Sequence, residues 1–535
     1  MDYDYIIVGA GSAGCVLANR LSADPGIRVL LLEAGGRDTN PWIHIPVGYF
    51  KTLHNPKTDW CYKTEPDPGL GGRSLDWPRG KTLGGSSSIN GLLYIRGQRQ
   101  DYDTWAQLGN SGWGYDDVLP LFKRSERHEL GASEHHGAEG GLAVSTMRAA
   151  STISEAVIAA AVEMGVPRSD DFNGARQEGA GYFQQTARNG LRCSSAKAFL
   201  KPARSRGNLE IVTHSHAQRL VFADDAPRRI AGVAYLRNGE PRTARLRPGG
   251  EVVLSAGAIG SPQLLELSGI GRGDILSAAG VPVRHALAGV GESLQDHLQI
   301  RLVYEVNVPT LNNAINSLPR RLAMGVQYAL LRKGPMSLGA SQVCIFARSM
   351  DWLETPDIQF HFQPLSAEKP GINMHPYPGI TLSVCQLRPE SRGHIHIKSP
   401  DAASHPRITP NYLSATADQD CAVRAMRYAR ALTRTSALAP FVVRERVPDN
   451  APVSDDELLD SARRISQTIY HPTSTCRMGQ DPLAVVDDRL RVHGLEGLRI
   501  ADASIMPTIT SGNTNAPTIM IGEKASDLIL ADRAR

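Results

Sequence analysis

The chain has 535 residues, enough for roughly two to four domains, and its 41% hydrophobic and 21% charged residues are typical of a globular protein. The net charge of +4 is small for this length, and no run of lysine and arginine predicts a nucleic-acid-binding surface. No apolar segment reaches the roughly 18 residues of a membrane span, and the first residues lack the features of a secretory signal. The seven cysteines form no CxxC pair, so we expect no disulfide framework and a cytoplasmic location.

The first predicted elements are a buried strand at residues 5–8, a glycine-rich turn, a helix and a second strand at 28–32. Gly9, Gly11 and Gly14 have GxGxxG spacing, and Glu33 ends the second strand. Such glycines let the backbone approach a pyrophosphate, the helix N-terminus attracts that anion, and the acid accepts hydrogen bonds from a ribose. This order predicts a dinucleotide-binding unit, while the pattern alone leaves FAD and NAD both open.

Two further glycine-rich segments follow along the chain. In RGKTLGGSSSINGLLYIRG, residues 79–97, two glycines precede three serines, and this loop can lie flat against a planar ring while its polar groups bind the ring edges. A solvated linker is the alternative, but the apolar residues that follow and the arginine near each end argue against it. GAIGSPQLLELSGIG, residues 257–271, follows a strand and predicts a short helix that begins near Ser261 and Pro262.

The stretch HPTSTCRMG, residues 471–479, places His471 close to Ser474 and Cys476. Four interpretations compete: a metal ligand, part of a nucleophilic pair, a general base and a buried structural imidazole. No GxSxG elbow surrounds Ser474, which argues against an acyl-transfer nucleophile. Other histidines lack an acid or cysteine at zinc-ligand spacing, so we expect them on the surface or in sheets, with no metal site. These are His135, His136, His214, His216, His394 and His396.

Four segments in order, GGSSSIN, SPQLLELSGIG, HPTSTCRMG and NTNAP, resemble those of the glucose–methanol–choline (GMC) oxidoreductases, a family of FAD enzymes. The resemblance covers essentially the whole chain. The stretches YIRGQRQDYDTWA and LRPESRGHIHIKSPD are similar to those of bacterial choline-dehydrogenase-like alcohol dehydrogenases.

This resemblance implies an α/β fold, α+β overall, with a discontinuous Rossmann-like FAD-binding domain. We expect that domain to comprise residues 1–155, 205–297 and 462–535. The remaining residues, 156–204 and 298–461, would form a substrate-binding domain built on an antiparallel sheet with helices.

The resemblance also implies which residues form the site. His471 and Asn515 would be the catalytic pair, with Tyr470 beside them at the substrate. Choline oxidase links FAD covalently through a histidine of the GGSS loop; that position is Ile89 here, so we expect non-covalent FAD. The expected cofactor-binding residues are Gly9, Gly11, Gly14, Glu33, Ala34, Arg79, Gly84, Gly85, Ser86, Asn90, Ala217, Ala256, Gly257, Asp502, Ala503, Pro517 and Thr518.

The expected reaction is oxidation of a primary alcohol to an aldehyde. A histidine takes the hydroxyl proton while a hydride moves to flavin N5. Choline enzymes use a glutamate against the quaternary ammonium, and residues 331–347 contain no acid, so we expect a neutral alcohol rather than choline. The electron acceptor is a quinone, another carrier or O₂. An O₂-dependent alcohol oxidase, a choline dehydrogenase and a hydroxynitrile-lyase-like enzyme stay open as alternatives, as do a homodimer and peripheral membrane contact.

Overall fold

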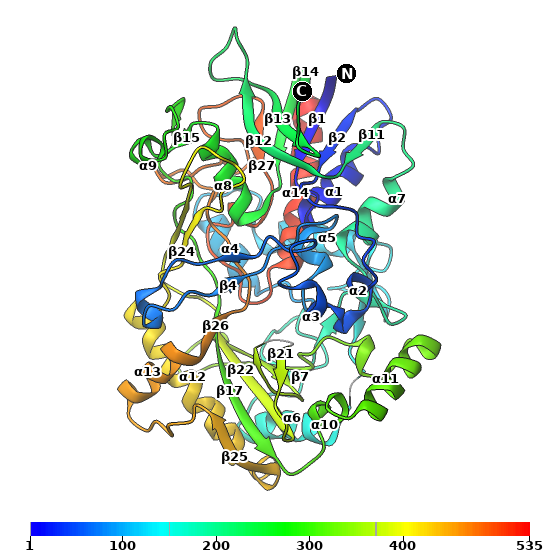
Figure 1. The fold of residues 1–535 in the computed structure, drawn as a ribbon, viewed down its shortest axis with the longest axis vertical. Helices are drawn as coiled ribbons and strands as arrows, with labels where there is room; N and C mark the ends of the chain where they lie inside the picture. Colours follow the sequence, from blue (N-terminus) through cyan, green and yellow to red (C-terminus); the bar gives the residue numbers. More distant parts are fainter. Residues whose placement is uncertain (1, 149, 370–371, 535) are drawn as a thin grey trace.

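The computed structural model describes residues 2–148, 150–369 and 372–534. Two large sheets, each with its own helices, lie one above the other along the long axis of the molecule (Figure 1). The upper sheet is mixed with a parallel core, and the lower sheet is antiparallel. This arrangement confirms the α/β fold class expected from the sequence.

Parallel strands form the core of the upper sheet, and they position the glycine-rich turn. In β1 (Asp2–Val8) every residue after Asp2 is buried, as expected for a strand covered on both faces. It pairs in parallel with β2 (Val29–Leu32) and β14 (Glu240–Leu254). The sheet continues through β11 (Leu209–Val212) on one side, and through β27 (Leu498–Ile500), β13 (Ile230–Arg237) and β12 (Ser215–Phe222) on the other.

The two ends of the chain meet on one face of this sheet. Helix α1 (Ser12–Leu21) packs against the last helix, α14 (Asn515–Arg533), and Figure 1 draws the two side by side. Their backbones approach so closely that a Cβ atom added at Gly522 would lie 2.9 Å from the carbonyl oxygen of Ala13. The N-terminal ends of both helices consequently open toward the space below the sheet, where Gly11, Ser12 and Asn515 line one cavity.

The lower sheet has the strand order β25, β17, β22, β19, β18, β7, with β26 also paired to β17. Helices pack on it, of which α12 (Thr416–Arg434) contacts β22. The other two are α6 (Thr152–Glu163) and α13 (Asp455–Ile465). The strands are β7 (Gly179–Tyr182), β17 (Leu298–Val306), β18 (Val343–Ala347), β19 (Ile358–Gln363), β22 (Gly379–Gln386), β25 (Val442–Val447) and β26 (Ser466–Thr468).

The chain passes between the two sheets at more points than the expected domain bounds contain. The bound at residue 155 falls inside α6, which packs on strands of the lower sheet. Strand β26 lies in the segment expected in the upper domain but pairs with β17. Conversely, the helical turn η4 (Ala196–Leu200), expected in the lower domain, packs on α1. The division into two domains stays a prediction, and its segments interleave at these points.

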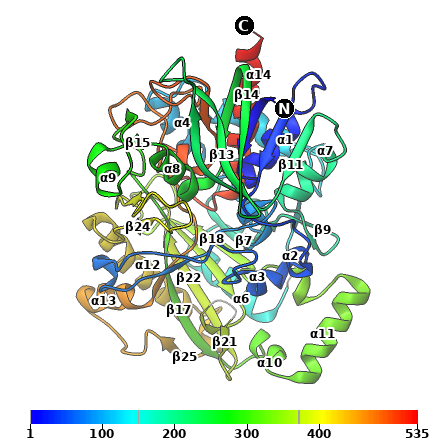
Figure 2. The ribbon, with the colours of Figure 1, turned by 45° about the horizontal axis from the view of Figure 1, so that its top comes forward.

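Helices α10 (Leu311–Ile315) and α11 (Leu318–Leu331) project from the lower body, as Figure 2 shows at the lower right. Among the described residues, no helix combines the length and the apolar character needed to cross a bilayer.

Gly14→Ala is predicted to destabilise the protein by about 1–3 kcal/mol, the usual cost of overpacking. The added Cβ would lie 2.0 Å from the carbonyl oxygen of Gly9, and this backbone contact cannot move aside. Gly207→Ala is the matched control, since its Cβ meets nothing within 4 Å. The midpoint of denaturant unfolding, followed by tryptophan fluorescence, measures both. Equal midpoints for the two variants would contradict the prediction.

Candidate active site

One cavity of about 330 Å³ connects the glycine-rich turn of the upper sheet with β17 and β19 of the lower sheet. Most residues expected at the cofactor line it, together with Tyr470, His471 and Asn515. Three residues of the expected cofactor set do not line the cavity: Gly14, Gly84 and Pro517. The other members of that set line it: Gly9, Gly11, Glu33, Ala34, Arg79, Gly85, Ser86, Asn90, Ala217, Ala256, Gly257, Asp502, Ala503 and Thr518.

Direct backbone contact joins the first two glycine motifs. A Cβ added at Gly85 would lie 2.7 Å from the Cα of Gly11. The backbone N–H of Gly84, whose φ of +87° suits glycine, donates a hydrogen bond to the carbonyl oxygen of Ala10 at 2.8 Å. The GGSSSIN loop therefore lies against the start of α1, where backbone N–H groups are free to bind an anion.

Glu33 has the surroundings expected of a ribose-binding acid. Its carboxylate accepts hydrogen bonds from the backbone N–H of Ala10 at 3.0 Å and of Gly35 at 2.8 Å. Burial raises the pKa of Glu33 to about 7, against the lowering effect of these two bonds. Two ionised oxygens offer about four acceptor positions. Positions are thus left for two ribose hydroxyls, and the residues present fit a dinucleotide.

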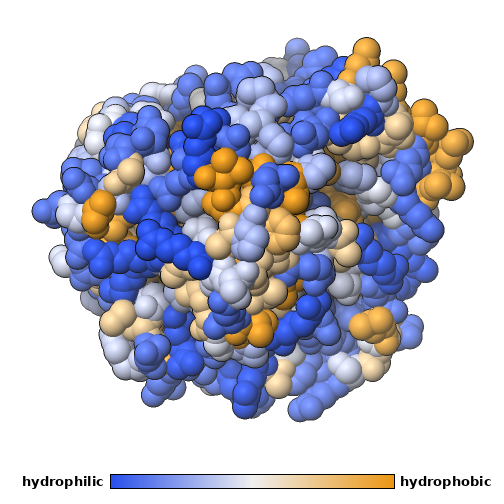
Figure 3. Space-filling model, turned by 90° about the horizontal axis from the view of Figure 1, so that it is seen from below, coloured by the Kyte–Doolittle hydropathy of each residue, from blue (hydrophilic) through white to orange (hydrophobic). Residues whose placement is uncertain are grey.

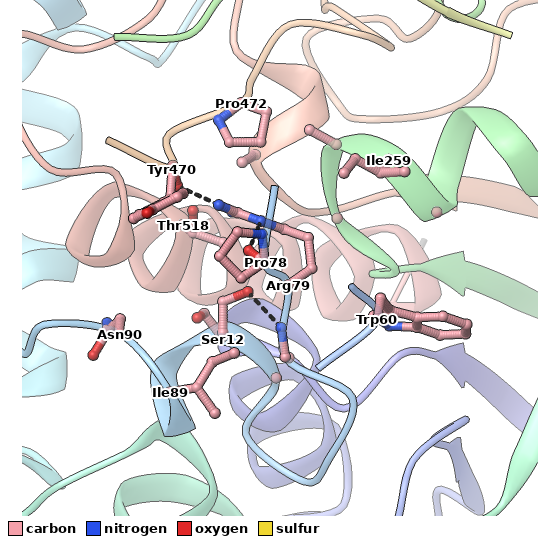
Figure 4. Close-up of a pocket in the computed structure, with 18 of the residues that line it drawn as sticks. Ser12, Trp60, Pro78, Arg79, Ile89, Asn90, Ile259, Tyr470, Pro472 and Thr518 are labelled. Carbon is pink, nitrogen blue, oxygen red and sulfur yellow. Dashed lines mark hydrogen bonds between the residues drawn. The ribbon is translucent and has the colours of Figure 1, made fainter. Parts of the chain in front are cut away.

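Arg79 and Ile89 flank the middle of the cavity (Figure 4). Arg79 Nη2 donates a hydrogen bond to the carbonyl oxygen of Tyr470 at 2.7 Å, which ties the GGSSSIN segment to the histidine segment. Tyr470 has a φ of +70°, a strained conformation for a residue with a side chain, directly before His471. Ile89 is buried and offers no atom that could bond covalently to a cofactor.

Helix α14 begins at the cavity with Asn515, within the NTNAP segment. Asn515 Oδ1 accepts a hydrogen bond from Ser12 Oγ at 2.8 Å, so the starts of α14 and α1 are tied together. Thr518, one turn further, also lines the cavity. A long helix presents partial positive charge at its N-terminus, which favours a ligand group that is or becomes negative.

A chain of hydrogen bonds fixes the proton positions on His471. His297 Nε2 lies 2.9 Å from the carbonyl oxygen of Leu387, which can only accept, so this nitrogen carries the proton. In neutral His297, Nδ1 is then an acceptor, and the proton of the 3.0 Å bond to His471 Nδ1 belongs to His471. His471 Nε2 is left as a bare acceptor, and Asn513 Nδ2 donates to it at 3.1 Å.

Both rings are held neutral. Burial lowers the pKa of His297 to about 4. Burial, followed by the neighbouring His297, His361 and Arg79, holds the pKa of His471 well below its usual range. His471 is only 7% exposed and lines the cavity, so a ligand there, rather than bulk water, can take the place of Asn513 at its unprotonated Nε2. This is the state that a general base requires.

Asp296 positions the backbone of His471. Its Oδ1 accepts a hydrogen bond from the His471 N–H at 2.6 Å, and its Oδ2 accepts one from Thr468 Oγ1 at 2.6 Å and another from the Tyr412 hydroxyl. Burial raises the pKa of Asp296 to about 6, while these hydrogen bonds and Arg79 oppose the rise. Three donors therefore compensate the burial of the carboxylate.

The structure brings His471 together with Asn513, whereas the sequence interpretation paired it with Asn515. Both asparagines line the cavity, but the hydrogen bond to His471 Nε2 comes from Asn513, two residues before α14 begins. Asn515 is turned toward Ser12 by the first turn of the helix. Asn513 is thus the asparagine of the NTNAP segment that contacts the imidazole, and the catalytic role expected of Asn515 stays a prediction.

Sequence reasoning missed several further residues of the cavity. His361 of β19 lines it, and burial lowers the pKa of this histidine to about 3. Gln299 and Arg301 of β17 line it as well. In the segment QIRLVYEV, polar residues at 299 and 301 alternate with apolar ones. That period of two indicates a strand with one polar face, and it was the available signal.

One of the histidines expected on the surface is buried. His136 Nδ1 lies 3.1 Å from Glu126, its Nε2 lies 2.9 Å from Asp171, and His128 is adjacent. Burial alone would lower the pKa of His136, but the bonds to Asp171 and Glu126 raise it to about 9. Arg96 Nη2 also contacts Glu126, at 2.8 Å. The carboxylates of Glu126 and Asp171 thus pair with His136 and Arg96, while the ring of His128 packs against that of His136.

Comparisons with known proteins agree with this geometry. The GMC oxidoreductase family models match residues 3–299 and 389–522. The chain is 45% identical to an alcohol dehydrogenase [acceptor] of Pseudomonas putida, covering 99% of this chain and 96% of that protein. It is 42% identical to human mitochondrial choline dehydrogenase, covering 99% and 90%.

Solved structures superpose over nearly the whole chain. Pyridoxine 4-oxidase from Mesorbium loti matches with a TM-score of 0.89 at 32% identity, covering 98% of this chain and 99% of that one. An Aspergillus oryzae formate oxidase, solved in a study of FAD modification, matches with a TM-score of 0.91 at 27% identity, covering 100% and 99%. The lining residues that suit a dinucleotide, Glu33 and the turn at Gly9 and Gly11, are compatible with FAD. By sequence, fold and site, the chain belongs to the GMC oxidoreductase family.

Proposed function

We propose that the protein is an FAD-dependent dehydrogenase that oxidises a primary alcohol to an aldehyde and passes the electrons to an external carrier. The bare Nε2 of His471, held beside Asn513 in the cofactor cavity, is the observation that carries this proposal. The similarity to an alcohol dehydrogenase [acceptor] supports the reaction class and the carrier. When bound, FAD supplies the acceptor for the hydride that leaves the alcohol carbon.

In this proposal His471 Nε2 accepts the hydroxyl proton of the alcohol, because an alkoxide is a far better hydride donor than a neutral alcohol. Asn513 Nδ2 donates a hydrogen bond to the same oxygen and holds it in place. His297 supports the base by accepting the Nδ1 proton of His471. The low pKa of His471 keeps it unprotonated, so a proton gained from the substrate is readily passed on.

The residues that line the cavity argue against choline as the preferred substrate. Among the described residues, its acids are Glu33, at the ribose end, and Asp502, which accepts hydrogen bonds from Gly257 N–H and Ser261 Oγ. A quaternary ammonium beside His471 would therefore meet no carboxylate from the lower sheet. Choline oxidation is the second candidate because of the 42% identity to human choline dehydrogenase. The proposed substrate therefore remains an alcohol other than choline, as expected from the sequence.

The cofactor is proposed to be non-covalent because Ile89 occupies the loop position that bonds to the flavin in choline oxidase. A cytoplasmic location is part of the same proposal, on the basis of the seven free cysteines. Two alternatives use the same cavity: an oxidase that passes electrons to O₂, and a lyase with an idle flavin. Anaerobic mixing with primary alcohols separates them, since bleaching of the flavin excludes the lyase and later admission of O₂ tests the oxidase.

His471→Ala is predicted to slow flavin reduction by about 10²–10⁴-fold, the usual range for loss of a general base. FAD content should stay normal, because the imidazole lies far from the glycine-rich turn. Asn513→Ala should slow reduction less, and the double variant should fall short of the product of the two effects, since both act on one oxygen. Rapid anaerobic mixing measures the step directly.

His394→Ala, a partly exposed histidine outside the cavity, is the control for this series. Asn515→Ala decides between the two asparagines. A larger loss for Asn515→Ala than for Asn513→Ala would overturn the assignment of Asn513, and an unchanged rate for His471→Ala with full FAD would overturn that of His471.

Acid precipitation of the purified protein is predicted to leave all the flavin in the supernatant. The physical reason is the buried aliphatic side chain of Ile89, which has no nucleophilic atom. Absorbance spectra of the pellet and the supernatant measure the partition. Flavin colour that stays with the pellet would refute non-covalent binding.

A further inference from the structure

Arg301 is a buried cation without a counter-ion. It lies on β17, is 6% exposed and lines the cavity. Among the described residues it has no hydrogen-bond or ion-pair partner, and its guanidinium nitrogens are not fully enclosed but reach the open space of the cavity. Guanidinium groups are almost never buried unpaired, because the loss of hydration is not compensated.

Other buried arginines of the chain follow that rule. Arg96 pairs with Glu126 at 2.8 Å, and Arg499 pairs with Glu251 and Asp532, both at 2.7 Å. Arg192 donates to the carbonyl oxygens of Ile43 and Asn90 at 2.8 and 2.7 Å. Arg301 differs from these in facing the cavity, where a bound ligand group can complete its hydrogen bonds.

The ligand group that fits Arg301 is not the cofactor's pyrophosphate. The pyrophosphate site is at the start of α1 in the upper sheet, whereas Arg301 belongs to the lower sheet. Its electrostatic neighbours include the imidazole of His375 and the phenols of Tyr49 and Tyr470, of which Tyr470 directly precedes His471. Arg301 is therefore on the substrate side of the cavity.

Alternation along β17 aims three side chains at the same face. His297 precedes the strand and contacts His471, Gln299 donates to the carbonyl oxygen of Thr468 at 3.1 Å, and Arg301 follows. Four residues of extended strand cover roughly 13 Å between His297 and Arg301. A substrate with its hydroxyl at His471 and an anionic group further along the strand would contact both.

We propose that Arg301 forms an anion subsite for a carboxylate of the substrate, so that the preferred substrates are hydroxy acids with a terminal primary hydroxyl. This inference rests on the proposed alcohol oxidation and replaces its neutral substrate with an anionic one. The planar guanidinium binds a carboxylate through two parallel hydrogen bonds, and the Tyr49 and Tyr470 hydroxyls are further donors beside it. A doubly charged phosphate would require more cations than this one arginine.

The test compares two substrates that differ only in charge. Anaerobic flavin reduction is measured with ω-hydroxycarboxylates of increasing chain length and with the corresponding ω-hydroxyamides. The wild type should reach half-saturation at lower concentrations with the acid at the optimal length. Arg301→Gln should raise that concentration about 10–100-fold for the acid, as expected for loss of charge-assisted hydrogen bonds, and leave the amide nearly unchanged.

Arg301→Lys, which keeps the charge but loses the planar fork, should give an intermediate value. A second measurement does not depend on how the variants fold. The wild-type holoenzyme is titrated with unreactive alkanoates while the flavin spectrum reports binding. The corresponding alkanamides should bind more weakly than the alkanoates. Equal half-saturation for acid and amide in the wild type would overturn the subsite while leaving alcohol oxidation standing. If neither reduces the flavin but the lyase assay is positive, the proposed function itself fails.

A second inference comes from the projecting helix α11, whose exposed face is hydrophobic. Leu318, Leu322, Val326 and Leu330 recur every four residues, which places them along one side of the helix, and Leu330 is 77% exposed. Tyr328 is the buried residue of α11, and its hydroxyl donates to the Gly190 carbonyl oxygen at 2.9 Å. Hydrophobic side chains gather at the right edge of Figure 3, where α11 lies in Figure 1.

Basic residues flank this stripe. Arg320 and Arg321 are exposed in the first turn, and Arg332 and Lys333 are exposed just after the last one. Residues 307–350 contain no aspartate or glutamate. A second copy of the chain is a poor partner, because a symmetric contact would bring like charges together. Apolar side chains bordered by cations fit a membrane surface that carries anionic lipids.

We infer that α11 docks the protein on anionic membranes, lying in the interface without crossing the bilayer. The short helix η5 (Pro335–Ser337) follows α11 and packs on η1 (Pro46–Gly48). Directly after η1, Tyr49 and Phe50 line the cavity. Docking would therefore place the substrate side of the cavity close to the lipid headgroups.

Co-sedimentation of the holoenzyme with vesicles tests this docking. Binding to phosphatidylcholine vesicles that contain phosphatidylglycerol is expected, with weaker binding at high salt. The double substitution Leu322→Glu with Leu330→Glu should lower binding at least about tenfold. Leu130→Glu is the matched control, because Leu130 is 79% exposed elsewhere on the surface. An equal loss for the control, no vesicle binding by the wild type, or a dimer that the double variant abolishes would overturn the inference.

Discussion

The hydrogen bond between His297 and His471 is the interaction on which the site depends. It joins two neutral imidazoles across 174 positions of the sequence and leaves a lone pair on the second ring where a ligand can use it. Two features keep both rings neutral: their burial, and the carbonyl oxygen of Leu387, which fixes the direction of the whole chain. Loss of one hydrogen bond in this series would change the tautomer of the two imidazoles, because each ring nitrogen is either donor or acceptor according to its neighbour.

Several groups with positive charge or partial positive charge line the remainder of the cavity. They are the helix starts at Ser12 and Asn515 and the guanidinium groups of Arg79 and Arg301. Such charges attract anionic ligand groups and stabilise negative charge that develops during a reaction. They also disfavour a protonated His471, since Arg79 is among the causes of its low pKa. The same charges therefore favour an anionic ligand and keep His471 unprotonated.

Local chemistry made the upper half of the site predictable. A turn between β1 and α1 requires glycine, and an acid at the end of β2 faces the same space, so Gly9, Gly11 and Glu33 could be identified from spacing. Spacing in the sequence could not identify Asn513 as the asparagine that contacts His471. Asn513 and Asn515 are two residues apart, and only the position where α14 begins decides which one faces the imidazole. His297, His361 and Arg301 join the site through pairing in the lower sheet, which connects distant segments.

The segments that carry the two histidines cross between the sheets as one ribbon. Gln295 pairs with Thr473 and Leu298 with Thr468, so the chain enters and leaves the lower sheet along the same antiparallel path. Both imidazoles of the pair are carried by this ribbon, His297 on one strand and His471 on the other. The backbone N–H of Ile469 also donates to the carbonyl oxygen of His297 at 3.0 Å, between these paired positions. Because the backbone pairing holds the two residues at a fixed spacing, a shift of one sheet against the other need not separate their rings.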